Sequence, residues 1–243
     1  MKIKKSNYKK LILKYILCII VSLILALFIR LFLCNFYIVP TNSMEPTIFP
    51  GDFIITEKLS YGARIFTSLK FDRYSDPKTV RLKGFDSIKR NDIIVFNYPF
   101  RYSEDTIRMN LEKIFVKRCI GLPGDTVLTV GSEIPFYIPR KGESINLTTD
   151  NFKLYHKQIV YETNAVICLK DTLVYINDTI VTHYTFTENW YFMAGDNVMN
   201  SRDSRNFGLI PEEYIIGRAC MTLTSKNPDT GKRRWERFMK LIK

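Results

Sequence analysis

The sequence is poor in histidine and has no pair of cysteines with metal-binding spacing. Of 243 residues only two are histidine, His156 and His183, and neither stands beside an aspartate motif that would complete a Ser-His-Asp triad. The cysteines form an odd set of five without C-x-x-C spacing, so we expect no metal site and can assign no disulfide. They are Cys18, Cys34, Cys119, Cys168 and Cys220. Glycine (11) and proline (10) are too few for a disordered chain, which predicts one sizeable folded core.

Acidic residues are nearly missing from both ends of the chain. Residues 1–14 contain six lysines and no acid, and residues 225–243 contain seven basic residues against Asp229 and Glu236. The ends therefore carry +6 and +5 of the net charge of +12, which leaves about +1 for everything between. This distribution argues against a basic groove for nucleic acid and is typical of segments at a membrane surface.

Charge is also almost absent from a long apolar run near the start. Between Tyr15 and Val39 the only charged residue is Arg30, and the inner part reads "YILCIIVSLILALFI". Those 15 residues rise about 22 Å of the roughly 30 Å needed to cross a bilayer. The helix becomes long enough to cross the bilayer if residues 11–13 are included and Lys14 and Arg30 snorkel to opposite interfaces.

No small-x-small site such as Ala-x-Ala follows this run, which argues against a cleaved leader and predicts a retained transmembrane anchor over residues 15–35. The six lysines place the basic tail 1–14 in the cytoplasm, and everything after Val39 then lies outside. The basic C-terminal end does not contradict this orientation, because long translocated domains cross largely regardless of charge.

Past the anchor the sequence is typical of strands. Short β-branched runs read "DFIITEK" and "DIIVFNY", a strand ending in a Pro-Gly turn reads "EKIFVKRCIGLPGD", and a hairpin about Asn177-Asp178 reads "LVYINDTIVTHY". Helical periodicity is scarce there. We predict a mainly β fold, with one elaborated antiparallel domain over residues 36–223 and variable excursions at 60–90 and 131–187.

The basic tail 224–243 has a helical pattern of its own. In "RRWERFMKLIK" four apolar residues recur at i, i+3, i+4 and i+7, which predicts an amphipathic helix. They are Trp235, Phe238, Met239 and Ile242. Such a helix lies on the outer membrane surface or packs on its own domain, and the sequence favours neither alternative.

Ser43 stands in "IVPTNSMEPTIFPGD", between Pro40 and Pro46, so this segment is not the interior of a helix. Serine, threonine and asparagine beside proline are ordinary turn formers, and on this stretch alone that is the simpler explanation. A nucleophile needs the same exposed hydroxyl on a fixed turn, together with a base.

Lysine is the base available. Strand alternation in "KIFVKRCIGLPGD" puts Phe115, Lys117 and Cys119 on one face, so Lys117 has apolar neighbours. Burial there would lower its pKa from about 10.4 by two to three units, at roughly 3 to 4 kcal/mol, and give a base near neutral pH. A lysine at a sheet edge that snorkels to water is the commoner case. The match of "SDPK", from Ser75 to Lys78, to an S-x-x-K pattern is set aside because Pro77 breaks the helix that this pattern needs.

A third cluster, "AGDNVMNSRDSRNFG", spans Ala194 to Gly208. Turn formers and charges at this density usually indicate a solvated loop. The same short hydroxyls and Asp-Arg alternation also suit a hydrogen-bonded shell that orients a catalytic group.

Taken in order behind an N-terminal anchor, "PTNSMEPT", "KRNDIIVF", "FVKRCIGLPGD" and "GDNVMNSRDSRNFG" closely resemble the conserved boxes of bacterial type I signal peptidases, also called leader peptidases. That family consists of Ser-Lys dyad serine endopeptidases, anchored in the bacterial plasma membrane, that remove signal peptides from exported preproteins. The resemblance covers the anchor and about a third of the outer domain.

The resemblance implies a role for each matching residue. Ser43 would be the nucleophile and Lys117 the general base, and the Ser43 backbone N–H and the Thr41 hydroxyl would form the oxyanion hole. Ser201 would orient the lysine amine, and Asp203 and Arg205 would form a supporting ion pair. No metal or cofactor is implied.

Family substrates carry small residues at the first and third positions before the cut and bind as an extended strand in shallow apolar pockets. By position, these pockets would be lined by Tyr37, Val39, Met44, Phe115 and Val116. The implied partners are signal peptides of exported preproteins, the lipid bilayer and the protein export machinery.

This chain departs from the family pattern at two places. Many members have Arg where Val198 stands, next to Met199, and we expect Arg202 or Arg205 to compensate. Asn42 replaces a frequent Gly, and Asn is the residue that next most easily tolerates a left-handed turn.

Three alternatives follow from these observations. Self-cleaving repressors use a related Ser-Lys site but carry DNA-binding helices and lack an anchor. A Ser-His site, as in signal peptidases of the endoplasmic reticulum, is disfavoured because Lys117 occupies the base position. A membrane-tethered, catalytically dead binding protein stays open because of Val198 and Met199, against the intact Ser43 and Lys117.

Overall fold

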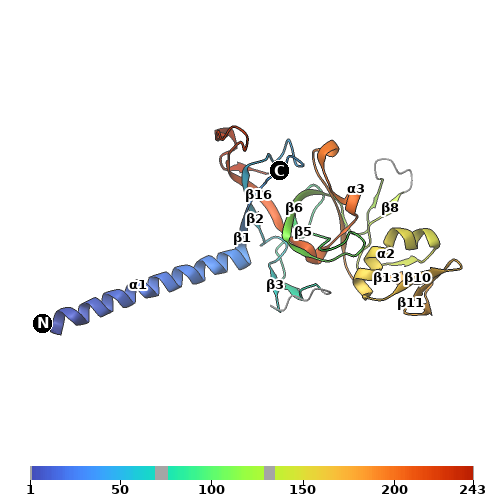
Figure 1. The fold of residues 1–243 in the computed structure, drawn as a ribbon, viewed down its shortest axis with the longest axis horizontal. Coiled ribbons are helices and arrows are strands. Elements are labelled where there is room, and N and C mark those ends of the chain that lie inside the picture. The colour runs from blue at the N-terminus through green and yellow to red at the C-terminus, as the bar shows by residue number, and fades with distance from the viewer. Residues whose placement is uncertain (1, 69–75, 129–134, 243) are drawn as a thin grey trace.

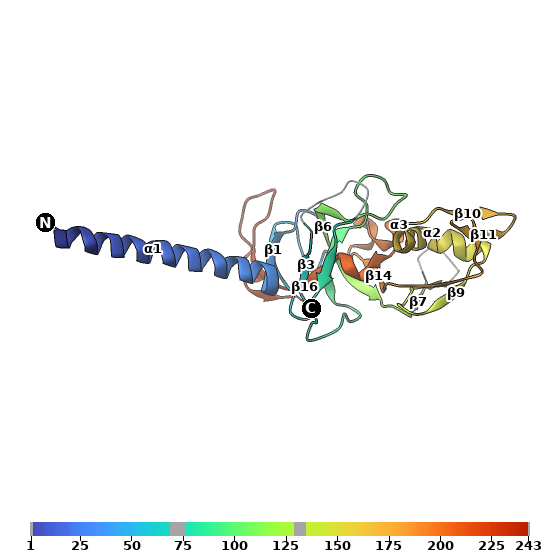
Figure 2. The same ribbon diagram turned by 90° about the horizontal axis from the view of Figure 1, so that it is seen from below.

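A single long helix leads into a β-sheet domain (Figures 1 and 2). The structure is a computed structural model that describes residues 2–68, 76–128 and 135–242. Helix α1 (Lys2–Phe28) continues into the π-helical turn η1 (Ile29–Leu33), and the chain then enters strand β1 (Cys34–Ile38). The stretch Tyr8–Leu33 is long and apolar enough to span a membrane, and it projects away from the domain. The helix therefore begins before the predicted boundary at residue 15.

The main sheet is antiparallel throughout and confirms the predicted mainly β fold. Its strand order is β1-β2-β16-β5-β6-β14-β15, with β17 paired to β16. The strands after β1 are β2 (Asp52–Glu57), β5 (Ile93–Tyr98), β6 (Asn110–Gly121), β14 (Trp190–Ala194), β15 (Ile210–Pro211), β16 (Ile215–Ser225) and β17 (Lys240–Leu241). Within this order Lys117 pairs with Ile94 of β5 and Arg118 pairs with Ala194 of β14, so the middle of β6 is enclosed on both sides.

Smaller hairpins carry the two predicted excursions. The first contains β3 (Arg64–Phe66) and β4 (Thr79–Arg81), and Ser75 between them lies outside the described residues. The second excursion, whose first residue Gly131 also lies outside them, extends from the far end of the sheet (Figure 1). In and beside it lie β7 (Thr126–Val127), β8 (Phe136–Tyr137), β9 (Ser144–Asn146), β10 (Ile167–Lys170), β11 (Leu173–Ile176), β12 (Thr179–Ile180) and β13 (His183–Thr185).

The hairpin predicted about Asn177-Asp178 joins β11 to β12. Both turn residues have positive φ, 48° and 63°, which is the conformation that a two-residue turn with the right twist requires and that Asn and Asp tolerate. The sequence pattern did not predict the helix in the same excursion, α2 (Thr149–Thr163). Thr148 caps its start by accepting the Asn151 N–H, and only Tyr155, Gln158 and Ile159 are buried. So narrow an apolar stripe explains why no periodicity indicated it.

The predicted amphipathic C-terminal helix is wrong. Residues 235–237 form one 3-10 turn, η4 (Trp235–Arg237), and Lys240–Leu241 form strand β17. Met239 between them has a φ of 48°, which ends any helix. Arg237, on the polar face of the expected helix, is instead the buried residue and is paired with Asp52. The contacts of Arg237 therefore determine the conformation of this segment, and the helical spacing of its apolar residues does not.

Two apolar cores lie on the sheet. The larger is centred on fully buried aromatic residues such as Phe96, Trp190 and Tyr214. The smaller lies beneath the loop that carries Ser43, and it contains Val39, Met44, Ile48, Ile54, Ile93, Val95, Ile216 and Ala219. The remaining short helices are η2 (Val198–Asn200), α3 (Ser204–Phe207) and η3 (Glu212–Tyr214). The five cysteines, all within the described residues, are free.

Candidate active site

The loop between β1 and β2 holds Ser43 on a tightly fixed turn. The Gly51 N–H donates to the Val39 carbonyl at 2.7 Å, and the Ile48 N–H donates to the Met44 carbonyl at 2.9 Å. Met44 and Ile48 are completely buried in the smaller core. Apolar side chains thus anchor the turn from below, while Ser43, directly before Met44, lines the cleft above.

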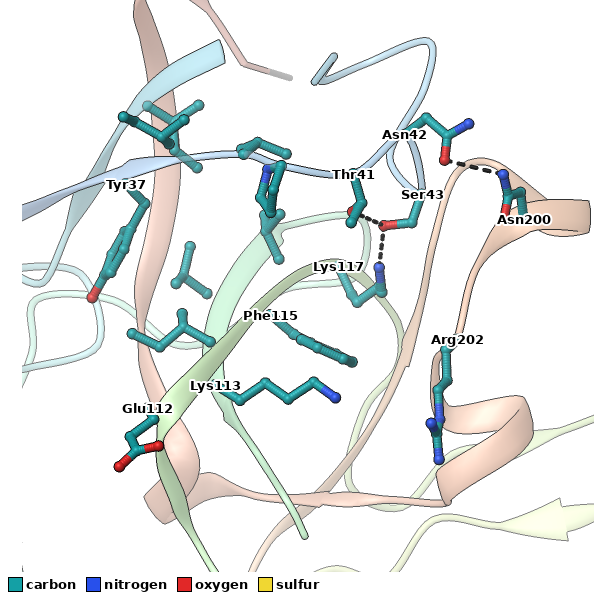
Figure 3. Close-up of a pocket in the computed structure, with 17 residues that line it drawn as sticks. Tyr37, Thr41, Asn42, Ser43, Glu112, Lys113, Phe115, Lys117, Asn200 and Arg202 are labelled. Carbon is teal, nitrogen blue, oxygen red and sulfur yellow. Dashed lines mark hydrogen bonds between the residues drawn. The ribbon is translucent and has the colours of Figure 1, made fainter. Parts of the chain in front are cut away.

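Lys117, in the middle of β6, reaches this serine. Its Nζ donates to the Ser43 Oγ at 2.5 Å (Figure 3), and only 4% of the lysine is exposed. Burial lowers the pKa of Lys117 from its ordinary value of 10.5 to about 8. Asp203 and Asp196 act in the opposite direction and Arg205 acts in the same direction, but burial is the largest cause. About a tenth of the amine is therefore neutral at pH 7.

Polar groups on the same turn lie beside the Ser43 hydroxyl. The Thr41 Oγ1 is 3.4 Å from the Ser43 Oγ. The Asn197 N–H donates to the Ser43 carbonyl at 3.1 Å, which fixes the peptide plane of the serine. Within the described part of the chain, the Ser43 N–H donates no hydrogen bond and remains available to a ligand.

Asp203 is the centre of a buried network behind the lysine. Its carboxylate accepts from the Ser201 hydroxyl at 2.7 Å, from the Gly195 N–H at 2.8 Å and from the Arg205 Nε at 2.8 Å. Burial alone would raise the pKa of Asp203, but the hydrogen bonds from Arg205, Gly195 and Ser201 hold it below its ordinary value. The Ser201 hydroxyl is directed at Asp203, and within the described residues no hydrogen bond joins it to Lys117.

Gly195 is required by the closeness of these groups. A Cβ at this position would lie 2.1 Å from the Ser201 Oγ and 2.5 Å from the Ser43 carbonyl oxygen. Only a residue without a side chain lets the end of β14 contact both the serine turn and the Asp203 network.

Sequence reasoning missed a second ion pair that links the same segments. Arg118 donates from Nε and Nη2 to both carboxylate oxygens of Asp196, each at 2.8 Å, and the Thr47 hydroxyl donates to Asp196 at 2.5 Å. The pair thereby ties β6 to the loop after β14 and to the serine turn. The sequence did contain a hint of this ion pair, because Arg118 directly follows the candidate base and Asp196 lies in the "GDN" box.

The two arginines that were expected to compensate for the arginine missing at position 198 both pair with acidic residues. Arg202 pairs with Glu104, and Arg205 pairs with Asp203. Val198 and Met199 are 56% and 95% exposed. Asn42 and Asn200 instead connect the loops, with the Asn200 side-chain amide donating to the Asn42 side-chain oxygen at 3.1 Å (Figure 3).

A cleft of about 640 Å³ runs from the serine and lysine along β1 and β6 (Figure 3). Four of the five predicted substrate residues line it, namely Tyr37, Val39, Phe115 and Val116. Met44 does not, because it is fully buried beneath the turn. Three further apolar residues line the cleft, and no sequence pattern singled them out. They are Ile54, Val95 and Ile114.

The histidines lie elsewhere. His156 belongs to α2 and packs against the Phe152 ring at 5.1 Å, and His183 belongs to β13 and contacts the Thr182 hydroxyl. Neither lines the cleft. The only side-chain base that the structure brings to the Ser43 hydroxyl, among the described residues, is Lys117.

The similarity to known proteins agrees with this geometry. Residues 12–224 match the family described as signal peptidase, peptidase S26. The chain belongs to this family. Signal peptidase I of Pseudomonas aeruginosa is 30% identical over 237 residues, which covers 89% of this chain and 74% of the relative. Signal peptidase I of Aquifex aeolicus is 29% identical over 225 residues, with 77% and 74% covered, and that of Rickettsia typhi is 30% identical over 199 residues, with 75% and 69% covered.

Membership of the peptidase S26 family confirms the resemblance inferred from the four boxes and identifies the chain as a serine endopeptidase of the signal peptidase type. The matched region includes Ser43, Lys117 and the whole of residues 194–208. The C-terminal segment that contains η4 and β17 lies beyond it.

Proposed function

We propose that the protein cleaves signal peptides from exported preproteins after small-x-small sites, with Ser43 as nucleophile and Lys117 as general base. The observation that carries this proposal is the 2.5 Å contact between the Lys117 Nζ and the Ser43 Oγ, made by a lysine that is almost completely buried. A serine hydroxyl needs a base within hydrogen-bond distance, and a lysine can serve only if its pKa is lowered.

The reaction would proceed in two steps. Neutral Lys117 takes the Ser43 proton while the Ser43 Oγ attacks the carbonyl carbon of the last residue of the signal peptide. The resulting ammonium then gives its proton to the leaving amine, the C–N bond breaks, and an ester joins Ser43 to the signal peptide. In the second step Lys117 takes a proton from water while the water oxygen attacks the ester carbonyl carbon. The Lys117 ammonium then returns this proton to the Ser43 Oγ as the ester C–O bond breaks, which releases the signal peptide as a carboxylic acid.

Negative charge on the tetrahedral intermediates would be stabilised by the Ser43 N–H and the Thr41 hydroxyl. The free N–H and the position of the Thr41 Oγ1, 3.4 Å from the nucleophile, support this assignment. Ser201 and the Asp203–Arg205 pair would act behind Lys117, where Asp203 fixes Ser201 and Gly195.

The substrate would bind as an added strand in the cleft between β1 and β6. β1 is an edge strand of the main sheet, so main-chain groups on its outer side do not pair with another strand of that sheet. Val39 and Val116, with Phe115 and Tyr37 beside them, would form the shallow pockets for the small residues. Met44 would contribute from below, by shaping the floor of the turn.

We further propose a single-pass arrangement in the bacterial plasma membrane. The lysine-rich start (1–14) would be cytoplasmic, and the peptidase domain (36–223) would lie on the other side. The anchor (15–35) would follow the apolar helix to its end at Leu33 and include the first two residues of β1. The basic segment 224–243 would complete that domain through β17. Signal peptides, the bilayer and the export machinery would be its partners.

A gel-shift assay tests the proposal. A purified preprotein with an Ala-x-Ala site is incubated with the detergent-solubilised wild type, Ser43→Ala, Lys117→Ala and, as a matched control, His183→Ala. We expect the wild type and His183→Ala to trim the preprotein after the second Ala, and the other two to leave it intact while folded. Full cutting by Lys117→Ala would contradict the role of Lys117 as general base. Binding without cutting by all four proteins would favour the tethered binding protein.

A further inference from the structure

A second cavity, of about 320 Å³, lies between the end of the apolar helix and the main sheet. The charged residues that line it are all cations, Arg30 from η1, Lys58 just after β2 and Arg64 from β3. Asn35 and Asn97 add side-chain amides, and no carboxylate of the described residues is part of the wall. The proposed mechanism uses none of these groups.

The two deeper cations are held in place by neutral partners. Lys58 is 7% exposed, and its Nζ donates to the main-chain oxygens of residues 30 and 31 at 2.7 Å and 3.3 Å. The Nη1 of Arg64 donates to the main-chain oxygen of Glu213 at 2.7 Å, and its Nη2 donates to the Asn97 side-chain oxygen at 2.6 Å. Their positions are therefore fixed, while their charges remain uncompensated by these partners.

The positive charges of these cations also repel one another. Burial, together with the charges of Arg64 and Arg30, lowers the pKa of Lys58 to about 8. Burial likewise lowers the pKa of Arg64 to about 10, with Arg81 acting in the same direction. The carboxylate of Glu213 opposes this shift, but it accepts hydroxyl hydrogen bonds from Thr79 and Tyr161 outside the cavity wall. An anion in the cavity would relieve this repulsion.

The shape and place of the cavity indicate which anion. Guanidinium and ammonium groups together match a phosphate, and the unused N–H groups of Arg30 and Arg64 can donate to it. Arg30 lies in the last turn of the apolar stretch Tyr8–Leu33, where a spanning helix reaches the layer of lipid phosphates. We propose that this cavity binds the phosphodiester headgroup of an anionic phospholipid. The inference requires no cleavage chemistry, so its failure would leave the roles of Ser43 and Lys117 untouched.

Native mass spectrometry of the full chain in detergent tests this inference. Short-chain phosphatidylglycerol, short-chain phosphatidylcholine and inorganic phosphate are titrated separately against the wild type, Arg30→Gln and Lys153→Gln. Lys153 is an exposed cation on α2, at the far end of the domain from α1, and supplies the same change of charge (Figure 1). We expect phosphatidylglycerol to bind more tightly than phosphatidylcholine, and Arg30→Gln alone to weaken that binding about fivefold.

Several outcomes would overturn the inference. Equal phosphatidylglycerol binding by the wild type and Arg30→Gln, or equal weakening in Lys153→Gln, would show that the cavity is not the site. Displacement of the lipid by inorganic phosphate at similar concentration would assign the cavity to a free anion. Displacement by an acidic peptide would assign it to a segment of the substrate. Arg64→Lys, which keeps the charge but loses the planar fork, should also weaken phosphatidylglycerol binding if the inference holds.

Discussion

At the scale of single residues, the proposed role of the buried Lys117 as general base predicts that activity depends on pH. With a pKa of about 8, only about a tenth of the lysine is neutral at pH 7, and the neutral fraction rises through pH 8. We expect kcat/KM for a soluble peptide substrate to increase with pH between 6 and 8 and to level off above. Lys58→Met is the matched control, because it removes the other lysine with a pKa of about 8 and should keep the midpoint. A profile that is flat from pH 6 to 9 would contradict the role of Lys117.

The same burial predicts that the active site costs stability. The unfolded lysine titrates near 10.5 and the folded one near 8, so the unfolded state binds more protons between these values and stability rises with pH there. Below pH 8 the cost is fully present, at about 3 kcal/mol. We expect Lys117→Met to be inactive yet to unfold at a higher temperature than the wild type at pH 6.5, with the gain shrinking toward pH 10.5. Thermal unfolding in detergent measures this, and a lower unfolding temperature at pH 6.5 would contradict it.

At the scale of elements, the C-terminal segment stabilises the loop that carries Ser43. Arg237 donates to Asp52 and to the Thr47 carbonyl oxygen, and both members of the ion pair are buried. Removing one partner leaves a buried charge, so Arg237→Met should lower the free energy of unfolding by about 3 to 5 kcal/mol. Asp52→Asn combined with Arg237→Met should cost less than Arg237→Met alone. Denaturant unfolding of the two variants measures both losses. A loss in the double variant as large as that in Arg237→Met, or larger, would contradict the coupling between Asp52 and Arg237.

The elements also differ in how far their sequences predict them. Strands β2, β5 and β6 have local signals, because β-branched residues alternate and a Pro-Gly turn ends the run. Helix α2 and the C-terminal segment do not. The first buries too few residues to show a period, and the second owes its conformation to Arg237, whose partner Asp52 is 185 residues away in the chain. Non-local contacts of this kind are invisible to a pattern of spacing.

At the scale of the whole molecule, the candidate site consists of three distant segments. Spacing and alternation indicated a turn at Ser43 and a half-buried lysine at Lys117, but no local pattern could bring them together. The prediction that Ser43 and Lys117 belong to one site came from the order of the four sequence boxes that resemble the signal peptidase family. What the boxes left out are contacts that depend on packing, namely the Arg118–Asp196 pair, the burial of Met44 and the direction of the Ser201 hydroxyl toward Asp203.

The whole molecule also has a fixed joint between its apolar N-terminal helix and its β-sheet domain. The Lys58 amine donates to the carbonyl oxygens of residues 30 and 31, and the Lys58 N–H donates to the Leu33 carbonyl oxygen at 2.9 Å. A cation on the last carbonyl groups of a helix satisfies them and is favoured by the helix dipole. This joint fixes the direction of the apolar helix relative to the domain that carries the cleft.

Lys58→Met keeps the length and burial of the side chain and the backbone N–H, but removes the amine that donates to residues 30 and 31. We expect cleavage of a preprotein embedded in vesicles to fall several-fold more than cleavage of a soluble peptide, because chemistry at Ser43 is local whereas access to an embedded substrate depends on the angle of the anchor. Arg30→Gln is the control, since its main-chain oxygen still accepts from Lys58 while its side-chain charge is lost. Equal losses on both substrates, or the same imbalance in Arg30→Gln, would assign the effect to the fold or to lipid binding rather than to the joint.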